Sequence, residues 1–524
     1  MESGTASTST ETNGAVNGAG AAAAEQIEVL DPATGGLVAK VDVDSPETVA
    51  ATVARVRANQ ADWEAMGIEG RYHWLGKLRD WLLDNAERVG DTMQAETGKV
   101  RADATTEAIY LTDLINFYGS KAGKFIGDEE VRPHSPLLAS KKLSIQYRPF
   151  PVVGIISPWN FPLTLALGDA IPALQAGAAV VIKPSEFTPL GLAEVVKAWK
   201  EEIGGPDVLD CVQGIGETGG ALIDHADFIQ FTGSDRTGRK VMARAAETLT
   251  PVSLELGGKD PMIVLADADL DRAANAAAYG GMMNSGQICI SVERIYVEEP
   301  AYDEFVQKLT KEVGGLRQGA DGKSFAKDVG AMTSPNQTAI VEGQVDDALA
   351  SGARALTGGK RVEGPGDYFE PTVLVDVDHS MKVMRDETFG PVVGVMKVRD
   401  SEEALKLAND TRYGLSASVF GEKGRAEQIA RRVECGAVNV NDVLVNYLAM
   451  DVPMGGWKES GIGFRHGEYG IKKYCRPESV VVTRFSGKRE PTWFPYTKAR
   501  RGLVGRIAQA FNARDLKRRL GMRG

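Results

Sequence analysis

The stretch VVGIISPWNFPLTLALGDAIPALQAGAAVVIKP at residues 152–184 decides the fold. Two short runs rich in β-branched residues predict strands at 152–157 and 178–184, and the segment near 163–176 between them predicts a helix. The chain continues this alternation with predicted strands at 208–214, 227–233 and 251–258 and predicted helices near 189–202 and 236–247. Such alternation predicts an α/β fold in which helices cover both faces of a doubly wound parallel sheet.

Three helical stretches are predicted before this region, at 45–66, near 70–97 and near 102–126. The first has Ser45 at its N-cap and Pro46 in its first turn, positions where these residues are favoured. In doubly wound sheets, ligands bind beyond the carboxyl ends of the strands. The chemistry is therefore expected in the strand-to-helix turns.

The composition is that of an ordinary globular protein, with 524 residues, 43% of them hydrophobic, and a net charge of −11. This length predicts two or three domains. The acidic balance argues against nucleic acid as a partner, because a phosphate backbone binds clustered positive charge. The five histidines fit no zinc motif, and no CxxC spacing occurs among the cysteines, which are Cys211, Cys289, Cys435 and Cys475. We therefore expect neither a disulfide framework nor a metal site.

Both ends of the chain differ from its middle. Residues 1–27 are predicted to be a disordered tail, because their Ser, Thr, Gly and Ala bury little apolar surface, and they lack the pattern of a signal peptide. No apolar run approaches the ~18 residues needed to cross a bilayer, so a cytoplasmic location is expected. The other end, 488–524, is predicted to be a basic amphipathic tail, and its part 496–524 contains nine Lys or Arg and one Asp.

Apolar residues recur every fourth residue within this basic tail, at Leu503, Ile507 and Phe511 and again at Leu516 and Leu520. If the tail is helical, this spacing gives an apolar stripe with Arg and Lys around it. One interpretation is a peripheral helix on an anionic membrane surface. The other is a basic, partly disordered tail, or one that docks on the acidic body of the chain.

Two glycine-containing motifs are candidates for a cofactor phosphate site. In FTGSDRTG at 231–238, Gly233 and Ser234 end a strand and a helix starts directly, so the N–H groups of its first turn are free to hold a pyrophosphate. A GxGxxG spacing also occurs at Gly214, Gly216 and Gly219, but it follows a late strand without a preceding βαβ unit. We therefore favour Gly233 and Ser234.

Three residues have the chemistry and the setting of a catalytic site. Cys289 follows a predicted helix at 269–283 and lies in a Gly-containing turn, where a thiol is accessible. Glu255 ends a predicted strand, where a carboxylate facing the crevice can activate water. Asn160, in the turn SPWNFP, can donate its amide N–H to an oxyanion. Each also has a purely structural interpretation, namely a buried thiol, a salt-bridged strand end and an Asn that closes a turn.

An ordered set of motifs then extends over residues 28–487: SPWNFPL, KPSEFTP, FTGSDRTG, LELGGKDP, GQIC, ETFGPV, NDTRYGLSASVF and PMGGWKESGIG. With these motifs the sequence resembles the aldehyde dehydrogenase superfamily. The resemblance implies a homodimer or homotetramer. It also implies the aldehyde dehydrogenase fold, with a Rossmann-like NAD-binding domain (28–130 and 151–254), an α/β catalytic domain (255–452) and a small oligomerisation sheet (131–150 and 475–487).

The resemblance also assigns roles to single residues. Cys289 is implied to be the nucleophile, Asn160 the oxyanion donor together with the backbone N–H of Cys289, and Glu255 the base that activates the hydrolytic water. The implied cofactor contacts are Trp159 and Ser234 along the path, Lys183 and Glu186 at the adenosine ribose, and Glu387 and Phe389 at the nicotinamide end. The implied reaction oxidises an aldehyde to the carboxylic acid and reduces NAD, through thiohemiacetal and thioester intermediates on cysteine.

Single positions refine the expected reaction. The presence of Glu255 favours hydrolytic release over transfer to coenzyme A. An acid at Glu186 would repel a 2′-phosphate, so NAD is favoured, with NADP as the alternative. Succinate-semialdehyde members carry Arg at the positions of Gly168 and Met283, and a buried carboxylate without such a partner is costly.

We therefore expect an apolar aliphatic or aromatic aldehyde as substrate. The predicted pocket residues are Leu163, Leu167, Met283, Ile288 and the stretch 443–450. Two alternatives stay open. One is a succinate-semialdehyde dehydrogenase, because the stretch GQICISVERIYV and the basic tail resemble actinobacterial-type proteins of that name. The other is a non-catalytic scaffold, against which the intact Cys, Glu and Asn set argues.

Overall fold

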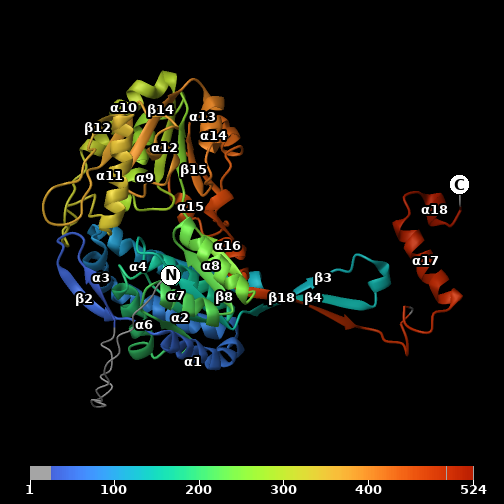
Figure 1. The fold of residues 1–524 in the computed structure, drawn as a ribbon. Coiled ribbons are helices and arrows are strands. Elements are labelled where there is room, and N and C mark those ends of the chain that lie inside the picture. Colours follow the sequence, from blue (N-terminus) through green and yellow to red (C-terminus); the bar gives the residue numbers. More distant parts are fainter. Residues whose placement is uncertain (1–24, 491, 523–524) are drawn as a thin grey trace, which may run out of the picture.

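The computed structural model describes residues 25–490 and 492–522. Two α/β lobes lie one above the other, and a narrow extension leaves the lower lobe sideways (Figure 1). Most of the tail predicted at 1–27 lies outside the described residues, but its last part already enters strand β1 (Gln26–Leu30), which pairs with β2 (Leu37–Asp42).

The lower lobe contains a six-stranded sheet in the order β17-β9-β8-β5-β6-β7. Its strands are β5 (Val152–Ile156), β6 (Ala179–Lys183), β7 (Leu209–Cys211), β8 (Phe228–Thr232), β9 (Val252–Glu255) and β17 (Gly461–Ile462). All neighbours run parallel except β17, which is antiparallel to β9. β6 and β8 are buried along their whole length, as in a parallel sheet covered on both faces, and the predicted doubly wound parallel sheet is confirmed.

Helices surround this sheet. The connecting helices are α5 (Thr164–Ala176), α6 (Leu190–Glu201), α7 (Gly216–His225) and α8 (Asp235–Glu247), and the preceding ones are α1 (Pro46–Ala65), α2 (Gly67–Asp84), α3 (Ala86–Thr97) and α4 (Arg101–Ile126). The predicted cap of α1 is confirmed, since the Ser45 hydroxyl accepts from the N–H of Thr48. The stretch predicted near 70–97 is divided between α2 and α3, because Asn85 hydrogen-bonds back to the carbonyl of Trp81 and ends α2.

The upper lobe contains a seven-stranded sheet in the order β12-β13-β14-β11-β10-β15-β16. Its strands are β10 (Asp260–Val264), β11 (Val292–Glu298), β12 (Arg354–Thr357), β13 (Thr372–Val375), β14 (Val392–Val398), β15 (Ser416–Phe420) and β16 (Ala437–Val440). Only β12 runs antiparallel to its neighbour. Along β10, Ile263 packs into one apolar cluster and Met262 and Val264 into another, so both faces of the sheet are covered.

The helices of the upper lobe are α9 (Leu270–Met282), α10 (Glu299–Gly314), α11 (Pro335–Ala350), α12 (Lys382–Arg385), α13 (Ser401–Asn409), α14 (Lys423–Ala430) and α15 (Val445–Leu448), with the 3₁₀ turn η2 (Met283–Gly286). After α15 the chain returns to the lower lobe through η3 (Lys458–Ser460), β17 and α16 (Gly467–Lys472). The return places α16 against α4 and α5. The lower lobe is therefore completed by residues that follow the upper one in sequence.

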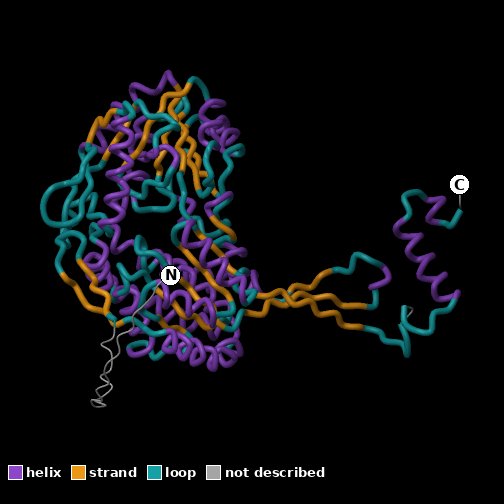
Figure 2. Tube along the Cα trace, viewed as in Figure 1, coloured by secondary structure: helices purple, strands orange, loops and turns teal. Residues whose placement is uncertain are grey.

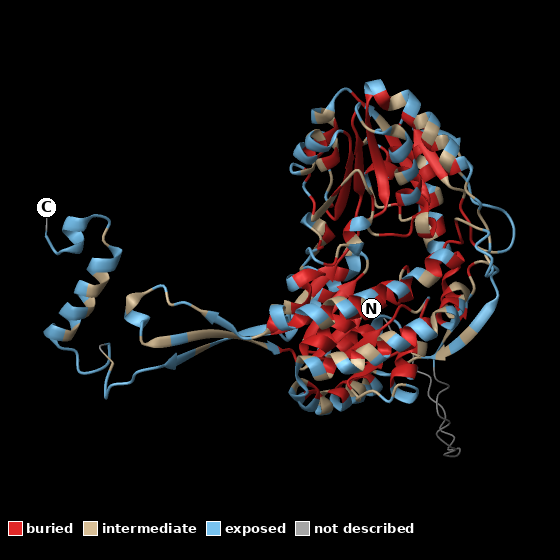
Figure 3. Cartoon of the chain, turned by 180° about the vertical axis from the view of Figure 1, so that it is seen from behind, coloured by how far each residue is buried: buried red, intermediate tan, exposed pale blue. Residues whose placement is uncertain are grey.

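The extension is a three-stranded antiparallel sheet in the order β18-β4-β3. It consists of β3 (Glu129–Val131), the 3₁₀ turn η1 (Pro136–Leu138), β4 (Lys141–Pro149) and β18 (Cys475–Thr483). The strands form a narrow ribbon that leaves the lobes (Figure 2), and most of their residues are exposed or half-buried (Figure 3).

Two helices, α17 (Lys498–Asn512) and α18 (Leu516–Arg519), lie beyond the far end of this ribbon (Figure 1). The structure therefore gives the basic tail a helical conformation. The described part of the tail lies against neither lobe, so these residues do not dock on the body of the chain. Among the described residues, no helix combines the length and the apolar character needed to cross a membrane.

Candidate active site

Two cavities meet at the turn that carries Cys289. The larger, of about 460 Å³, is lined by the ends of β8 and β9 and by the segment after α12. The smaller, of about 310 Å³, is lined by α4, the turn after β5, η2 and the segment before α15. Cys289 and Asn160 line both cavities, and Glu255 lines the larger one. The structure thus brings the three sequence-predicted catalytic candidates to one place.

A tight turn presents the thiol. Asn284, Ser285 and Gly286 all have positive φ angles, of 52°, 57° and 70°, so the chain turns sharply after α9. A Cβ on Gly286 would lie 2.0 Å from the carbonyl oxygen of Gly390, and only glycine therefore fits there. The half-buried Cys289 follows at the exit of this turn, where its side chain lines the cavities.

Two hydrogen bonds hold Asn160 in place, one from its side-chain amide and one to its backbone carbonyl. Its Nδ2 donates to the carbonyl of Gln287 at 2.9 Å, and the amide of Asn284 donates to the carbonyl of Asn160 at 3.1 Å. A side-chain amide has two N–H groups, so one remains for a ligand in the cavity. In the described chain no backbone carbonyl accepts from the N–H of Cys289. Two donors are thus available beside the sulfur.

Glu255 is the last residue of β9 and is buried. Its Oε1 has no hydrogen-bond partner within the described residues, and its Oε2 lies 3.9 Å from Nη1 of Arg465. Burial raises the pKa of Glu255 to about 7, although the charge of Arg465 opposes the shift. A carboxylate that titrates near neutral pH and has free lone pairs beside a cavity is suited to accept a proton from water.

A buried cluster of charged side chains lies next to Glu255. Arg465 donates to Asp169 at 2.7 Å and also hydrogen-bonds to Thr232. The ammonium of Lys473 lies 3.1 Å from the same Asp169 carboxylate and 2.7 Å from the amide oxygen of Gln230. Two cations therefore face one internal acid, and the excess positive charge is directed at Glu255.

The thiol itself is protonated at neutral pH in this environment. Burial raises the pKa of Cys289 to about 12, and Arg465 opposes the shift while the nearby carboxylates add to it. A thiolate is the reactive form of cysteine, so the proton must leave as the substrate engages.

The larger cavity has the residues predicted for a nicotinamide cofactor. It is lined by Trp159, Gly233, Ser234, Glu387 and Phe389. The rings of Trp159 and Phe389 meet edge to face, with centroids 5.3 Å apart. At the other side, Ser234 caps α8, and the helix N-terminus opens on this cavity as a phosphate site requires. These residues fit NAD(P), with phosphate at α8 and an aromatic wall near the thiol.

Residues 387–389 contain the predicted contacts to the nicotinamide end of the cofactor, and a buried ion pair fixes this segment. Glu293 pairs with Lys259, accepts from the backbone N–H groups of Thr388 and Phe389, and so holds this segment over the cavity. The Glu387 carboxylate accepts from the N–H of Gly258 at 3.0 Å, and burial raises its pKa to about 8.

The predicted ribose contacts lie in the adjacent turn. Lys183 ends β6, and its ammonium is 3.4 Å from the half-exposed carboxylate of Glu186. Neither residue lines the larger cavity. The GxGxxG glycines, at the start of α7, line neither cavity.

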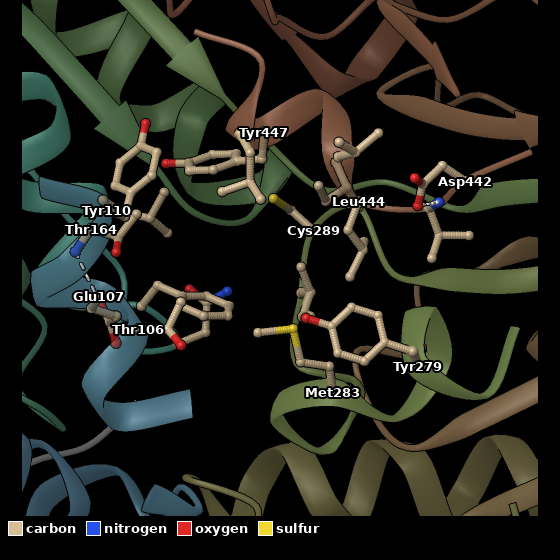
Figure 4. Close-up of a pocket in the computed structure, with 18 residues that line it drawn as sticks. Thr106, Glu107, Tyr110, Thr164, Tyr279, Met283, Cys289, Asp442, Leu444 and Tyr447 are labelled. Carbon is tan, nitrogen blue, oxygen red and sulfur yellow. Dashed lines mark hydrogen bonds between the residues drawn. The ribbon is translucent and has the colours of Figure 1, made fainter. Parts of the chain in front are cut away.

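The smaller cavity is mostly apolar. In Figure 4 the Cys289 sulfur faces an open space with Tyr447 and Leu444 on one side and Met283 and Tyr279 on the other. Of the predicted pocket residues, Met283 and Ile288 line it, as do Val443, Leu444, Val445, Tyr447 and Leu448 from the predicted stretch.

The assignment of Leu163 and Leu167 to the pocket is wrong. Both are fully buried in the core of the lower lobe, and Phe161, Thr164 and Leu165 line the cavity instead. Spacing by four residues correctly indicates that the two leucines share one helix face, but that face of α5 packs on the interior.

The charges at this cavity are acidic. Glu107 and Asp442 line it, and no Lys or Arg among the described residues does so. The Glu107 carboxylate accepts from the N–H groups of Leu163 and Thr164 and pairs with buried Lys99 at 2.6 Å. The Lys99 ammonium sits 3.9 Å from the centroid of the Phe161 ring and does not line the cavity.

Several residues of the site have no signal in the sequence. Arg465 follows the last quoted motif by two residues, but nothing in its spacing relates it to Glu255. Lys259 belongs to the motif LELGGKDP, yet its partner Glu293 is 34 residues away. The lining tyrosines Tyr110 and Tyr279 come from α4 and α9, and nothing in the sequence distinguishes them from the other residues of those helices.

Comparison with known proteins identifies the family. The model of the "Aldehyde dehydrogenase family" matches residues 20–480. The chain therefore belongs to this family. The chain is 40% identical over 479 residues to the 4,4'-diapolycopene aldehyde oxidase of Methylomonas sp, covering 90% of this chain and 88% of the relative. It is 39% identical over 479 residues to a Mycobacterium ulcerans protein named "Putative succinate-semialdehyde dehydrogenase [NADP(+)] 2". This match covers 90% of this chain and 91% of that relative.

Solved structures agree with this assignment. The solved structure of the "Putative Aldehyde Dehydrogenase PutA from Anabaena variabilis" superposes with a TM-score of 0.85 at 37% identity, covering 90% of this chain and all of that chain. The predicted aldehyde dehydrogenase fold is thus confirmed. The protein is an NAD(P)-dependent oxidoreductase that oxidises aldehydes, and members of its family act on small aldehydes and usually form oligomers.

Proposed function

We propose that this enzyme oxidises an apolar aldehyde to the carboxylic acid through a covalent intermediate on Cys289. The observation that carries the proposal is the position of Cys289 and Asn160 on both cavities at once. An aldehyde in the smaller cavity and a cofactor in the larger one then reach the sulfur from opposite sides. Glu255 lines only the cofactor side, where hydrolytic water enters.

The first step forms a C–S bond. The thiol of Cys289 gives its proton to water, the resulting thiolate attacks the aldehyde carbon, and the carbonyl oxygen becomes an oxyanion. The free N–H of the Asn160 amide and the backbone N–H of Cys289 donate to it, which stabilises the thiohemiacetal and the transition state that leads to it. NAD(P) held in the larger cavity by Trp159, Ser234 and Phe389 would supply the hydride acceptor. Loss of hydride from the thiohemiacetal carbon leaves a thioester on Cys289.

The second step hydrolyses the thioester. Glu255 accepts a proton from water, the resulting hydroxide attacks the thioester carbon, and the acid leaves as the sulfur regains its charge. Arg465 keeps a fraction of Glu255 ionised near neutral pH by opposing the effect of burial. This use of a carboxylate base makes hydrolytic release, rather than transfer to coenzyme A, the proposed outcome.

An apolar substrate is supported by the wall of the smaller cavity. Its lining is aromatic and aliphatic with two acids and no described Lys or Arg, so a distal carboxylate would be buried without a partner. The similarity to a 4,4'-diapolycopene aldehyde oxidase is consistent with an apolar substrate.

Succinate semialdehyde is the second candidate. The similarity to a protein named for that activity supports it, and the ammonium of Lys99 lies against the Phe161 ring, which lines the cavity. The pairing of Lys99 with Glu107 argues against its contact with a substrate carboxylate. A ring movement at Phe161 would be required for that contact.

Initial rates with NAD and NADP across hexanal, decanal, benzaldehyde and succinate semialdehyde test the substrate. We expect kcat/KM for the apolar aldehydes to exceed that for succinate semialdehyde by at least about tenfold, because one unpaired buried polar group costs more than 1 kcal/mol. A preference for succinate semialdehyde would contradict the proposed pocket.

We also propose NAD as the preferred cofactor, because the Glu186 carboxylate would repel a 2′-phosphate. The relatives named for NADP(+) support the alternative. The ratio of kcat/KM for the two cofactors decides between them.

We assign NAD(P) binding to the lower lobe, the nucleophile to the upper lobe and subunit contact to the ribbon β18-β4-β3. The ribbon is exposed and two of its edge residues, Val481 and Val482, are apolar and at least half exposed, which supports pairing with another subunit. A homodimer or homotetramer is the proposed assembly, and light scattering after size-exclusion chromatography measures which of them forms.

A further inference from the structure

Residues 484–490 and 492–522 form a separate basic and apolar surface, here called the C-terminal tail. It follows β18 and contains α17 and α18. α17 lies against η1 at the outer end of the ribbon, and neither tail helix has a buried residue. Figures 1 and 3 show the tail far from both lobes and almost entirely exposed.

The tail is strongly basic and short of partners. It has two acids, Glu490 and Asp515, and eleven basic residues: Arg484, Lys488, Arg489, Lys498, Arg500, Arg501, Arg506, Arg514, Lys517, Arg518 and Arg519. Within the described residues only Arg484 and Arg518 form ion pairs, with Glu130 and Asp515. No carboxylate of the described residues forms an ion pair with the remaining nine cations.

The same surface is apolar to an unusual degree for an exposed segment. Before α17, Phe485 is 80% exposed and Phe494 is 74% exposed, and Trp493 and Tyr496 are exposed beside them. Further exposed apolar residues lie on both helices and just after α18, at Leu503, Phe511, Leu516, Leu520 and Met522. Aromatic and aliphatic side chains interspersed with Arg and Lys match the interface of a bilayer, where rings sit at the headgroup level and cations meet anionic lipids.

We propose that the C-terminal tail binds the surface of an anionic lipid bilayer. Charge alone would suit any acidic partner, but the exposed aromatic rings, Leu516 and Leu520 need an apolar phase as well, which a lipid surface supplies. The tail lies on it without crossing it, because α17 has fifteen residues and four of them are Lys or Arg. Lipid binding is independent of the proposed reaction, and its readout requires no turnover.

Co-sedimentation of the full chain with vesicles tests this proposal. We expect the protein to pellet with vesicles of phosphatidylcholine and phosphatidylglycerol, and not with phosphatidylcholine alone. Raising the salt to about 1 M should release most of it, because the screening length falls to about 3 Å.

Two tail variants separate charge from apolar contact. The charge variant K517Q/R518Q/R519Q should bind anionic vesicles at least about tenfold more weakly, since each cation near the surface contributes about fivefold. The apolar variant F511S/L516S/L520S should also bind at least about tenfold more weakly, because burial of these side chains in lipid is lost. A matched control, K197Q/K423Q/L249S, removes two exposed lysines and the 89% exposed Leu249 from the lobes and should bind like the wild type.

Three results would overturn the proposal. They are failure of the wild type to pellet with anionic vesicles, equal pelleting of wild type and charge variant, and a loss of binding in the control variant as large as in the tail variants. A smaller molar mass for the apolar variant in solution, without lipid binding by the wild type, would instead assign the tail to contact with a second copy.

Discussion

Replacing Glu255 by Gln should stop the reaction at the thioester. The variant keeps the size of the side chain, and Arg465 keeps its partner Asp169, so the buried cluster remains balanced. The first turnover does not need the base that activates water. We therefore expect a burst of one reduced cofactor per active site, followed by a steady-state rate lower by about 10²- to 10⁴-fold, the usual contribution of a general base.

The pKa of about 7 for Glu255 sets the pH dependence of the wild type. Burial raises this pKa, so the base form is present above it and is lost as the pH falls through it. With a pKa of about 7, the ionised fraction is about one tenth at pH 6 and about nine tenths at pH 8, so hydrolysis should accelerate roughly tenfold over this interval. The residual rate of Glu255→Gln should lack this rise.

Stopped-flow absorbance of the reduced nicotinamide measures the burst and the steady state in one trace. Glu96→Gln is the matched control, because burial also raises the pKa of Glu96, to about 8, yet this carboxylate holds the N-terminus of α6 and lines neither cavity. The control should keep the wild-type pH profile. The reasoning is refuted if Glu255→Gln keeps its steady-state rate within about threefold of wild type, or if its burst falls as much as its steady state.

Three further substitutions have defined outcomes. Asn160→Ala should lower kcat by about 10²- to 10³-fold with the fold intact by circular dichroism, because one oxyanion donor is lost; near-full kcat would exclude the assigned role. Glu186→Gln should shift the ratio of kcat/KM for NAD over NADP toward NADP, since a repulsive charge is removed, and an unchanged ratio would place the ribose elsewhere. Arg465→Lys should move the pH profile less than Arg465→Gln does; the Gln variant should need higher pH for hydrolysis, because its lost charge lowered the pKa of Glu255. Identical profiles for wild type and Arg465→Gln would remove Arg465 from the account.

The alternating pattern of the sequence was sufficient for the first sheet. β6 and β8 are buried on both faces, and short β-branched runs such as AAVVIKP that alternate with helical stretches are typical of such strands, so the parallel sheet and its ligand edge were predictable. The same alternation of strand and helix patterns predicts where the chain turns. It correctly indicates the strand end at Glu255, the turn at Cys289 and the helix start after Ser234.

Side-chain direction was less predictable. Leu163 and Leu167 have the spacing of a pocket stripe, but a helix that separates a cavity from a core has apolar residues on both faces. Sequence spacing places residues on a face and does not say which face meets the cavity. The pocket residues Phe161 and Leu165 therefore required the three-dimensional packing.

Long-range electrostatics was not predictable at all. Arg465 lies 210 positions after Glu255 and reaches it only because β17 returns to pair with β9. The ion pair of Lys259 and Glu293 likewise joins the residue before β10 to the neighbouring strand β11. Charges that tune a site across such distances leave no local pattern in one sequence.

The most direct test of the central claim is the mass of the Cys289 peptide after one turnover. Glu255→Gln is mixed with NAD and decanal, quenched in acid, digested and measured by mass spectrometry. We predict that the peptide containing Cys289 carries the mass of the aldehyde less two hydrogen atoms, as a thioester requires, and that peptides containing Cys211, Cys435 or Cys475 are unmodified. An unmodified Cys289, or an acyl group on another cysteine, would contradict the account.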